Sequence, residues 1–170
     1  RTLSMAEIKA IWSALGEMNA NYSSIIKLLL LTGQRRTEIG SLTWDEVDLE
    51  KTEIEFPPSR TKNGYPHVVP LSPTCVELLR TQEKREDCAL VFTSTGRSPF
   101  SGYSKSKVQL DEASGVTNWV INDLRRTFST ELNNLGVLPH IVEACINHVT
   151  GEAKSGVAGV YNKAHYLPER

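Results

Sequence analysis

The feature that most constrains the fold of this chain is an apolar run that ends at a glycine and is followed closely by two arginines. Residues 25–31 (IIKLLLL) form the most apolar stretch of the sequence, and residues 32–39 (TGQRRTEI) follow it. A buried helix that ends in this way carries cations to the surface. Each guanidinium is permanently charged, and its donors fit two oxygens of a carboxylate or phosphate. The stretch therefore predicts an anion site.

A second arginine pair, Arg125 and Arg126, lies far downstream within a helical pattern. At 100° per residue, Leu124, Phe128 and Leu135 fall on one face of this helix, and we expect that face to be apolar. Arg125 lies at its edge, and Arg126 points to solvent. Arg125 should thus be partly buried, and it needs a partner because desolvating an unpaired charge is costly.

The sequence alone does not determine which groups these arginines bind. Arg125 can form an internal ion pair with Glu38, or it can bind a phosphate. Arg35 precedes Glu38 by three residues, a spacing that allows a local pair on one helical turn. That pair is either a surface salt bridge or a carboxylate that orients an arginine used elsewhere.

Composition limits the class of protein. The chain has 170 residues, 39% hydrophobic and 23% charged, which fits one soluble globular domain. No apolar run reaches the roughly 20 residues of a membrane span.

Cys75, Cys88 and Cys145 are widely spaced, which fits a reducing compartment and predicts no zinc site. The net charge of −1 argues mildly against nucleic acid, although a local basic patch can exist on a neutral protein. Because the first residue is Arg1, we expect a piece of a longer protein.

The patterns predict an α+β fold, a mostly α-helical single domain with a small antiparallel β-sheet. Ser4 and Glu7 form a capping box that opens the first helix. Residues 53–56 alternate like a strand. Residues 60–62 and 67–69 flank Asn-Gly, which predicts a hairpin with Lys62 at its tip, and residues 45–51 read as a polar connection. Further helices are expected over residues 21–32, 37–42, 73–85, 103–113, 122–136 and 139–146, with a short buried segment at 90–92 and a loop at 93–102.

Three other side chains are candidates for chemistry. Lys62 is either a solvated hairpin lysine or a functional cation. His148 follows the helix at 139–146 and precedes a glycine-rich stretch. Tyr161 follows residues 157–160 (VAGV), where a tyrosine is either a core anchor or a nucleophile. The remaining histidines are assigned to structural or surface positions: His67, His140 and His165.

Taken together, six short motifs occur in a characteristic order. They are TGQRRTEI at 32–39, RTKNG at 60–64, VPLS at 69–72, DLRRT at 123–127, NH at 147–148 and VAGVYN at 157–162. This order closely resembles the catalytic domain of tyrosine recombinases, especially integrases of prophages and genomic islands, over essentially the whole chain. The resemblance implies one catalytic domain over residues 1–170, with the upstream DNA-binding domains outside this chain.

The resemblance also implies roles for individual residues. Asn122 departs from the family, which usually has a histidine there. An amide can donate a hydrogen bond to a phosphate oxygen but cannot accept and return a proton near neutral pH. Asn122 can also serve simply as a helix N-cap. The implied catalytic residues are Arg35, Lys62, Arg125, His148 and the nucleophile Tyr161, supported by Glu38 and Asn122, with Arg36 and Arg126 contacting DNA.

The resemblance finally implies an activity and its partners. The expected function is site-specific recombination of double-stranded DNA through a 3′-phosphotyrosine intermediate, in integration or excision of a mobile element. The expected assembly is a tetramer on DNA, without metal, cofactor or membrane, in the cytoplasm of a bacterium. Two alternatives are a type IB topoisomerase-like activity, which rejoins the same strand, and a DNA-binding remnant with impaired cleavage because of Asn122.

Overall fold

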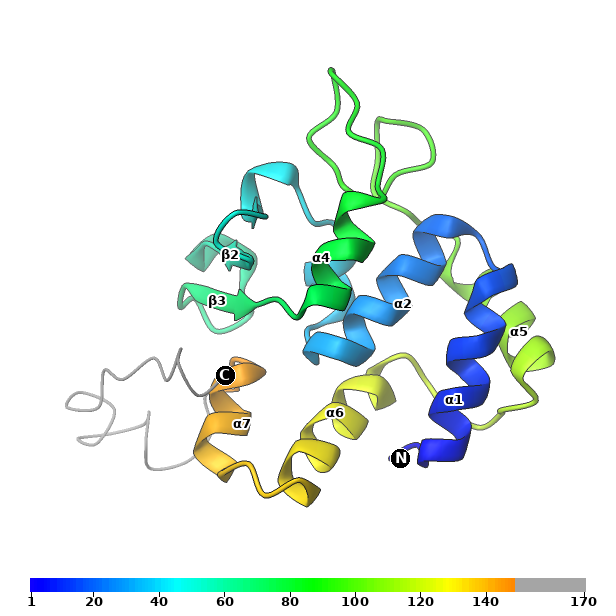
Figure 1. Cartoon of the computed structure of the whole chain (residues 1–170). Coiled ribbons are helices and arrows are strands. Elements are labelled where there is room, and N and C mark those ends of the chain that lie inside the picture. The colour runs from blue at the N-terminus through cyan, green and yellow to red at the C-terminus, as the bar shows by residue number, and fades with distance from the viewer. Residues whose placement is uncertain (149–170) are drawn as a thin grey trace.

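The computed structural model of this chain describes residues 1–148. They fold into a group of helices with a small sheet at one side (Figure 1). The helices are α1 (Met5–Ala14), α2 (Ala20–Thr32), α3 (Arg36–Gly40), α4 (Pro73–Arg80), α5 (Tyr103–Ser114), α6 (Asn122–Asn134) and α7 (Pro139–Cys145). The strands are β1 (Val47–Asp48), β2 (Glu53–Phe56) and β3 (His67–Pro70), with 3₁₀ turns at Leu15–Glu17, Trp44–Glu46 and Pro58–Arg60. The predicted fold class is confirmed.

Helix α2 is the centre of the core. It packs against α3, α4 and α6, and it lies between α4 and α1 in Figure 1. Its side chains at Ile25, Ile26 and Leu28 are fully buried. The Asn19 side chain accepts a hydrogen bond from the Tyr22 N–H and starts the helix. The predicted helix over residues 21–32 is therefore confirmed.

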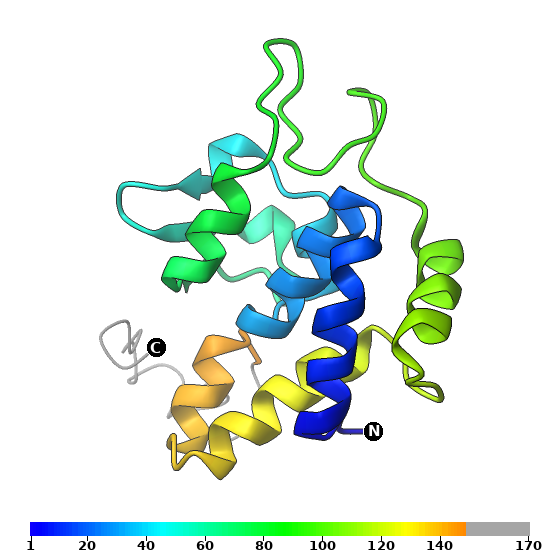
Figure 2. The ribbon, with the colours of Figure 1, turned by 45° about the vertical axis from the view of Figure 1, so that its right-hand side comes forward.

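Helices α1 and α5 pack against each other on the far side of α2 from the sheet (Figure 2). The predicted capping box opens α1. The Ser4 hydroxyl accepts from the Glu7 N–H, and the Ser4 N–H donates to the Glu7 carboxylate at 2.7 Å. Such a box satisfies donors that a helix end leaves without intrahelical partners.

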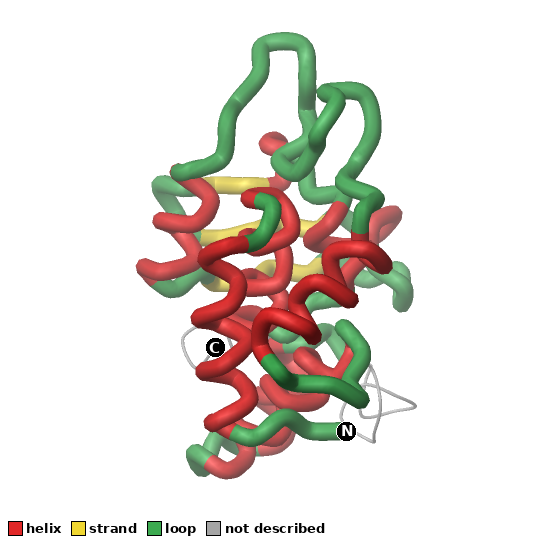
Figure 3. Tube along the Cα trace, turned by 90° about the vertical axis from the view of Figure 1, so that its right-hand side faces the viewer, coloured by secondary structure: helices red, strands yellow, loops and turns green. Residues whose placement is uncertain are grey.

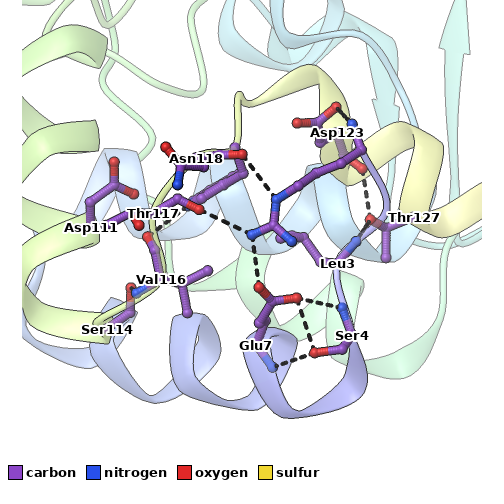
Figure 4. A network of polar contacts seen from close by, with 12 residues as sticks. Leu3, Ser4, Glu7, Asp111, Ser114, Val116, Thr117, Asn118, Asp123 and Thr127 are labelled. Atoms are coloured by element: carbon purple, nitrogen blue, oxygen red, sulfur yellow. Dashed lines mark hydrogen bonds and ion pairs between the residues drawn. The ribbon is translucent and has the colours of Figure 1, made fainter.

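Polar contacts join the N-terminal segment to the start of α6 (Figure 4). The Leu3 N–H donates to the buried Thr127 hydroxyl at 2.9 Å, and that hydroxyl donates to the Asp123 carbonyl at 2.7 Å. The Arg1 guanidinium donates to the carbonyls of Thr117 and Asn118 in the loop before α6. These contacts fix the first turn of α6, the helix that carries Arg125.

The sheet is antiparallel in the order β1-β2-β3 and lies behind the helices in the view of Figure 3. Ile54 faces Val47 on one side and Val69 on the other. The prediction of a purely polar connection over residues 45–51 was wrong, because it contains a 3₁₀ turn and β1. A strand of two residues is too short to show an alternating pattern in the sequence.

The β-hairpin predicted between residues 60–62 and 67–69 differs from the structure in its first strand and in its turn. The strand that pairs with β3 is β2, and Pro57–Pro58 end it, since proline has no N–H for the ladder. Residues 57–66 form the connection, so residues 60–62 are not a strand. Asn63 does not adopt a positive φ, although Gly64 does, and no two-residue turn forms.

Three helix ends also differ from the prediction. Helix α4 ends at Arg80, not 85, because the side chains of Thr81 and Gln82 both donate to the Leu78 carbonyl. Helix α6 ends before Leu135, a residue that is 79% exposed and does not face the core. Asn122 is the first residue of α6 and not its N-cap, a position that Ile121 occupies.

A long connection, residues 81–102, projects from one end of the domain between α4 and α5 (Figures 1 and 3). At its centre Val91 and Phe92 are buried, as predicted, and Thr43 forms a bridge with Leu90. No helix within residues 1–148 has the length and apolar character to cross a bilayer.

Gly33 offers a stability test of the α2 terminus. Its φ is +65°, and an added Cβ would lie 2.8 Å from Cγ of Phe128. Gly115 ends α5 with φ +70° and open space around it. We expect Gly115→Ala to lower the free energy of unfolding by about 1–2 kcal/mol, the cost of the left-handed backbone. Gly33→Ala should cost about 1–3 kcal/mol more through overpacking. Equal losses in urea unfolding would contradict the close contact with Phe128.

Candidate active site

Arg35 is held at the junction between α2 and α3. Gly33 ends α2 in the left-handed conformation, and Arg35 is the extended residue that precedes α3. Arg35 Nη1 donates to Glu38 Oε1 at 2.8 Å, and the Arg35 N–H donates to Glu38 Oε2 at 2.9 Å. Glu38 is 3% exposed. The local pair predicted from the spacing forms, and the buried carboxylate orients the guanidinium.

Arg125 binds two carbonyl oxygens and not Glu38. Its Nη1 donates to the Gly33 carbonyl at 2.7 Å, and its Nη2 donates to the Ile146 carbonyl. The internal ion pair with Glu38 that the sequence left open does not form, because Glu38 is already bound to Arg35. One planar guanidinium thus joins α6 to the start of the α2–α3 turn and to the end of α7.

The two arginines influence each other electrostatically. Burial, and then repulsion by Arg35, lower the pKa of Arg125 to about 10, against the opposing attraction of Glu38 and Glu143. This repulsion fits the geometry, in which Arg125 binds the carbonyl of Gly33, two residues before Arg35. A bound anion would relieve it, since an opposite charge nearby favours the charged form of a base.

Gln34 is a buried member of the site that the sequence analysis missed. Its Nε2 donates to the carbonyls of Thr32 and Cys145 at 2.8 and 2.9 Å, so its Oε1 faces Nε2 of His67 at 3.1 Å. Because this oxygen only accepts, the hydrogen bond requires a proton on Nε2 of His67. His67 is buried, so of the structural and surface positions that the sequence left open it takes the structural one. The partners His67 and Cys145 lie 33 and 111 residues from Gln34 along the chain, so no local pattern of the sequence identifies Gln34.

His148 lies just beyond α7. Its Nδ1 is 2.7 Å from Oε2 of Glu143, and its N–H donates to the Glu143 carbonyl at 2.9 Å. The imidazole is partly exposed. Glu143 was not predicted, because a spacing of five residues does not correspond to a helical neighbour. A carboxylate at Nδ1 fixes the orientation of the ring, as it does for many functional histidines.

Lys62 is exposed in the connection between β2 and β3. The next residue, Asn63, donates from Nδ2 to Oδ1 of Asn147 at 2.8 Å, and Asn147 precedes His148. The connection that carries Lys62 is therefore bound to the end of α7. Lys62 and Arg125 thus lie on segments that both hydrogen-bond residues 146–147.

A cavity of about 490 Å³ opens beside Arg35 and is also lined by Arg36, Lys107 and Asn122. Arg36 stacks over the Tyr103 ring at 4.9 Å, and within residues 1–148 it forms no ion pair with a carboxylate. Asn122 is exposed at the first turn of α6. The cavity thus presents an unneutralised guanidinium and an amide next to Arg35.

Arg126 lies apart from this group. The Arg126 side chain is 59% exposed, on the solvent side as predicted, and pairs with Asp123 at 2.7 Å. Tyr161 lies outside the described residues. Within residues 1–148, no group of histidine, cysteine, aspartate and glutamate side chains could hold a metal ion.

Comparison with known proteins identifies the family. The Phage integrase family matches residues 1–164 of this chain, so the chain belongs to that family. Prophage integrase IntZ of Escherichia coli (strain K12) is 34% identical over 170 residues, which cover 98% of this chain and 41% of IntZ. The chain spans less than half the length of the curated relatives it matches.

Solved recombinases share the fold. The crystal structure of XerA recombinase matches with a TM-score of 0.72 at 23% identity, over 88% of this chain and 55% of that chain. The Tn1549 transposon integrase in complex with circular intermediate DNA matches with a TM-score of 0.68 at 14% identity, over 88% of this chain and 58% of that chain. The fold that the resemblance implied, that of a tyrosine recombinase catalytic domain, is confirmed.

Anion binding tests the cluster around Arg35. Sulfate should raise the melting temperature of the wild type more than that of Arg35→Ala, because an anion that binds only the folded state stabilises it by mass action. Sulfate also stabilises proteins in general, so the measured quantity is the difference between the two proteins. Arg80→Ala, an exposed arginine on α4, is the control and should respond like the wild type. An equal response of all three would contradict the anion site.

Proposed function

We propose that this chain, over residues 1–170, is the catalytic domain of a tyrosine-type site-specific DNA recombinase, an integrase of a prophage or another mobile element. The observation that carries the proposal is the Arg125 guanidinium. It binds Gly33, two residues before Arg35, and Ile146, two residues before His148. Two neighbouring guanidiniums oriented by buried groups suit the two non-bridging oxygens of a phosphodiester.

The chemical step follows from these positions. Arg35 and Arg125 neutralise the non-bridging oxygens and hold the phosphorus for in-line attack. The Tyr161 oxygen forms a bond to phosphorus, and the bond to the 5′ oxygen breaks, which leaves a 3′-phosphotyrosine. Lys62 gives its proton to the departing 5′ oxygen. Elsewhere, an arginine supplied to a transferring phosphoryl group contributes about 10³–10⁵ in rate. The bond energy is kept in the intermediate, so rejoining requires neither ATP nor a metal or cofactor.

His148 is the proposed acceptor of the Tyr161 proton. Asn122 stands where a family member usually has a histidine, and its amide cannot take up a proton. In the neutral imidazole, the carboxylate of Glu143 at Nδ1 favours a proton on that nitrogen. Nε2 of His148 is then the basic atom. Asn122 donates a hydrogen bond to a phosphate oxygen from the rim of the cavity.

The proposed substrate is double-stranded DNA, bound by several protomers in a tetramer inside a bacterial cell. The integrase names of relatives such as IntZ support this proposal, as does the Tn1549 integrase structure, which contains DNA. Arg36 and Arg126 are the proposed contacts to the DNA backbone. Both guanidiniums are accessible from solvent, and only Arg126 has a carboxylate partner within residues 1–148.

Tyr161→Phe tests the nucleophile. The change removes one oxygen and hardly alters volume, so folding and DNA binding should stay near those of the wild type. The covalent adduct with a suicide DNA substrate, seen as a shifted band on a denaturing gel, should vanish. Tyr166→Phe is the matched control and should form the adduct normally.

The outcomes separate the alternatives. If Tyr161→Phe still forms the adduct, Tyr161 is not the nucleophile, and loss of the adduct in Tyr166→Phe would move the role to Tyr166. A wild type that binds DNA without forming any adduct would support a DNA-binding remnant. An adduct that rejoins only to its own strand would support a topoisomerase-like activity.

Salt dependence tests the backbone contacts. DNA affinity should fall steeply with salt, because each neutralised phosphate contributes a slope of about −0.9 in log–log form. Arg36→Ala should weaken binding to all sequences and reduce the slope by about 1. Arg80→Ala should leave both unchanged. An affinity that is insensitive to salt, or an unchanged slope in Arg36→Ala, would contradict the contact.

A further inference from the structure

A pair of asparagine side chains joins two loops that are 84 residues apart in sequence. Nδ2 of Asn63 donates to Oδ1 of Asn147 at 2.8 Å and to its carbonyl at 3.2 Å. Nδ2 of Asn147 returns a longer hydrogen bond of 3.4 Å to Oδ1 of Asn63. Asn147 is only 4% exposed. The contact is thus a reciprocal amide pair, largely shielded from water.

The backbone of Asn147 shows that the pair depends on a particular conformation. Its φ is +48°, in the left-handed region. For a residue other than glycine this region costs roughly 1–2 kcal/mol, although asparagine tolerates it better than most. The turn directs the amide of Asn147 toward Asn63. A glycine would adopt the same backbone more readily but would lack the amide.

The connection that carries Asn63 is organised internally. The Thr61 hydroxyl donates to the Tyr65 carbonyl at 2.7 Å, and the Tyr65 N–H donates to Oδ1 of Asn63 at 3.1 Å. Thr61 is itself buried. The connection therefore has a defined shape of its own, and the Asn63 amide attaches that shape to the end of α7.

The attachment lies next to two proposed catalytic residues. Lys62 directly precedes Asn63, and His148 directly follows Asn147. Neighbouring Cα atoms are about 3.8 Å apart, so each of these residues is one peptide unit from the amide pair. We propose that Asn63 and Asn147 are positioning residues, which hold Lys62 at the distance from His148 that protonation of the departing 5′ oxygen requires. This inference rests on the proposed function.

Asn147→Gly and Asn63→Ala test the inference. Asn147→Gly keeps the left-handed turn accessible and removes only the amide. Asn63→Ala removes the other partner together with the acceptor of the Tyr65 N–H, and alanine tolerates the backbone there because Asn63 has no positive φ. Each variant should form the covalent adduct about 10- to 100-fold more slowly than the wild type, the cost of a misplaced catalytic group. The double variant should be no slower than the slower single one, because the two amides act as a unit.

A substrate with sulfur in place of the bridging 5′ oxygen separates positioning of Lys62 from general damage. A thiolate leaves without protonation, because a thiol has a pKa near 8.5, about 7 below that of water. Both variants, like Lys62→Ala, should recover to within a few-fold of the wild-type rate on this substrate. Normal rates on ordinary DNA, or slow rates on both substrates, would overturn the inference. If the wild type itself formed no adduct on either substrate, the proposed function would fail instead.

Discussion

The hydrogen bonds of Arg125 to the carbonyls of Gly33 and Ile146 are the interactions on which the arrangement of the site depends. One guanidinium binds the turn after the central helix and the end of α7, and it does so from α6, which the N-terminal segment anchors. Three elements distant in sequence thus meet at one planar group. The chain places an arginine here, rather than a lysine, because only a guanidinium presents several donors in a fixed plane.

The same arrangement places two arginines where they repel each other, and a bound anion would reduce this repulsion. Arg35 is neutralised locally by Glu38, yet it still repels Arg125. Gln34 adds a neutral buried link between the α2–α3 turn and α7, so that the arrangement does not depend on charge alone. The site is therefore built before any anion arrives, which is the condition under which electrostatic stabilisation of a transition state is most effective.

The features that the sequence predicted best are those that depend on residues near one another along the chain. The capping box at Ser4, the core helix and the pair of Arg35 with Glu38 all arise within a few residues, and each was confirmed. The strand β1 was missed because two residues carry no periodicity. Gln34 was missed because its contacts with His67 and Cys145 span 33 and 111 residues, and the Asn63–Asn147 contact because it spans 84. The grouping of Arg35 with Arg125 came from resemblance to a family and from no local pattern, and the nucleophile Tyr161 stays a prediction.

The turn from α2 to α3 has a consequence for how chains of this kind can vary in length. Between Gly33 and Arg35, three successive residues each hold a separate long-range or capping contact. A residue inserted between Gly33 and Arg35 would move Gln34 into the place of Arg35 and displace the Arg35 guanidinium relative to the groups that Gly33 and Gln34 bind. The projecting connection over residues 81–102 carries none of these contacts (Figure 1). An insertion in an exposed part of this connection would thus leave the contacts of the site in place, whereas an insertion in the turn would not.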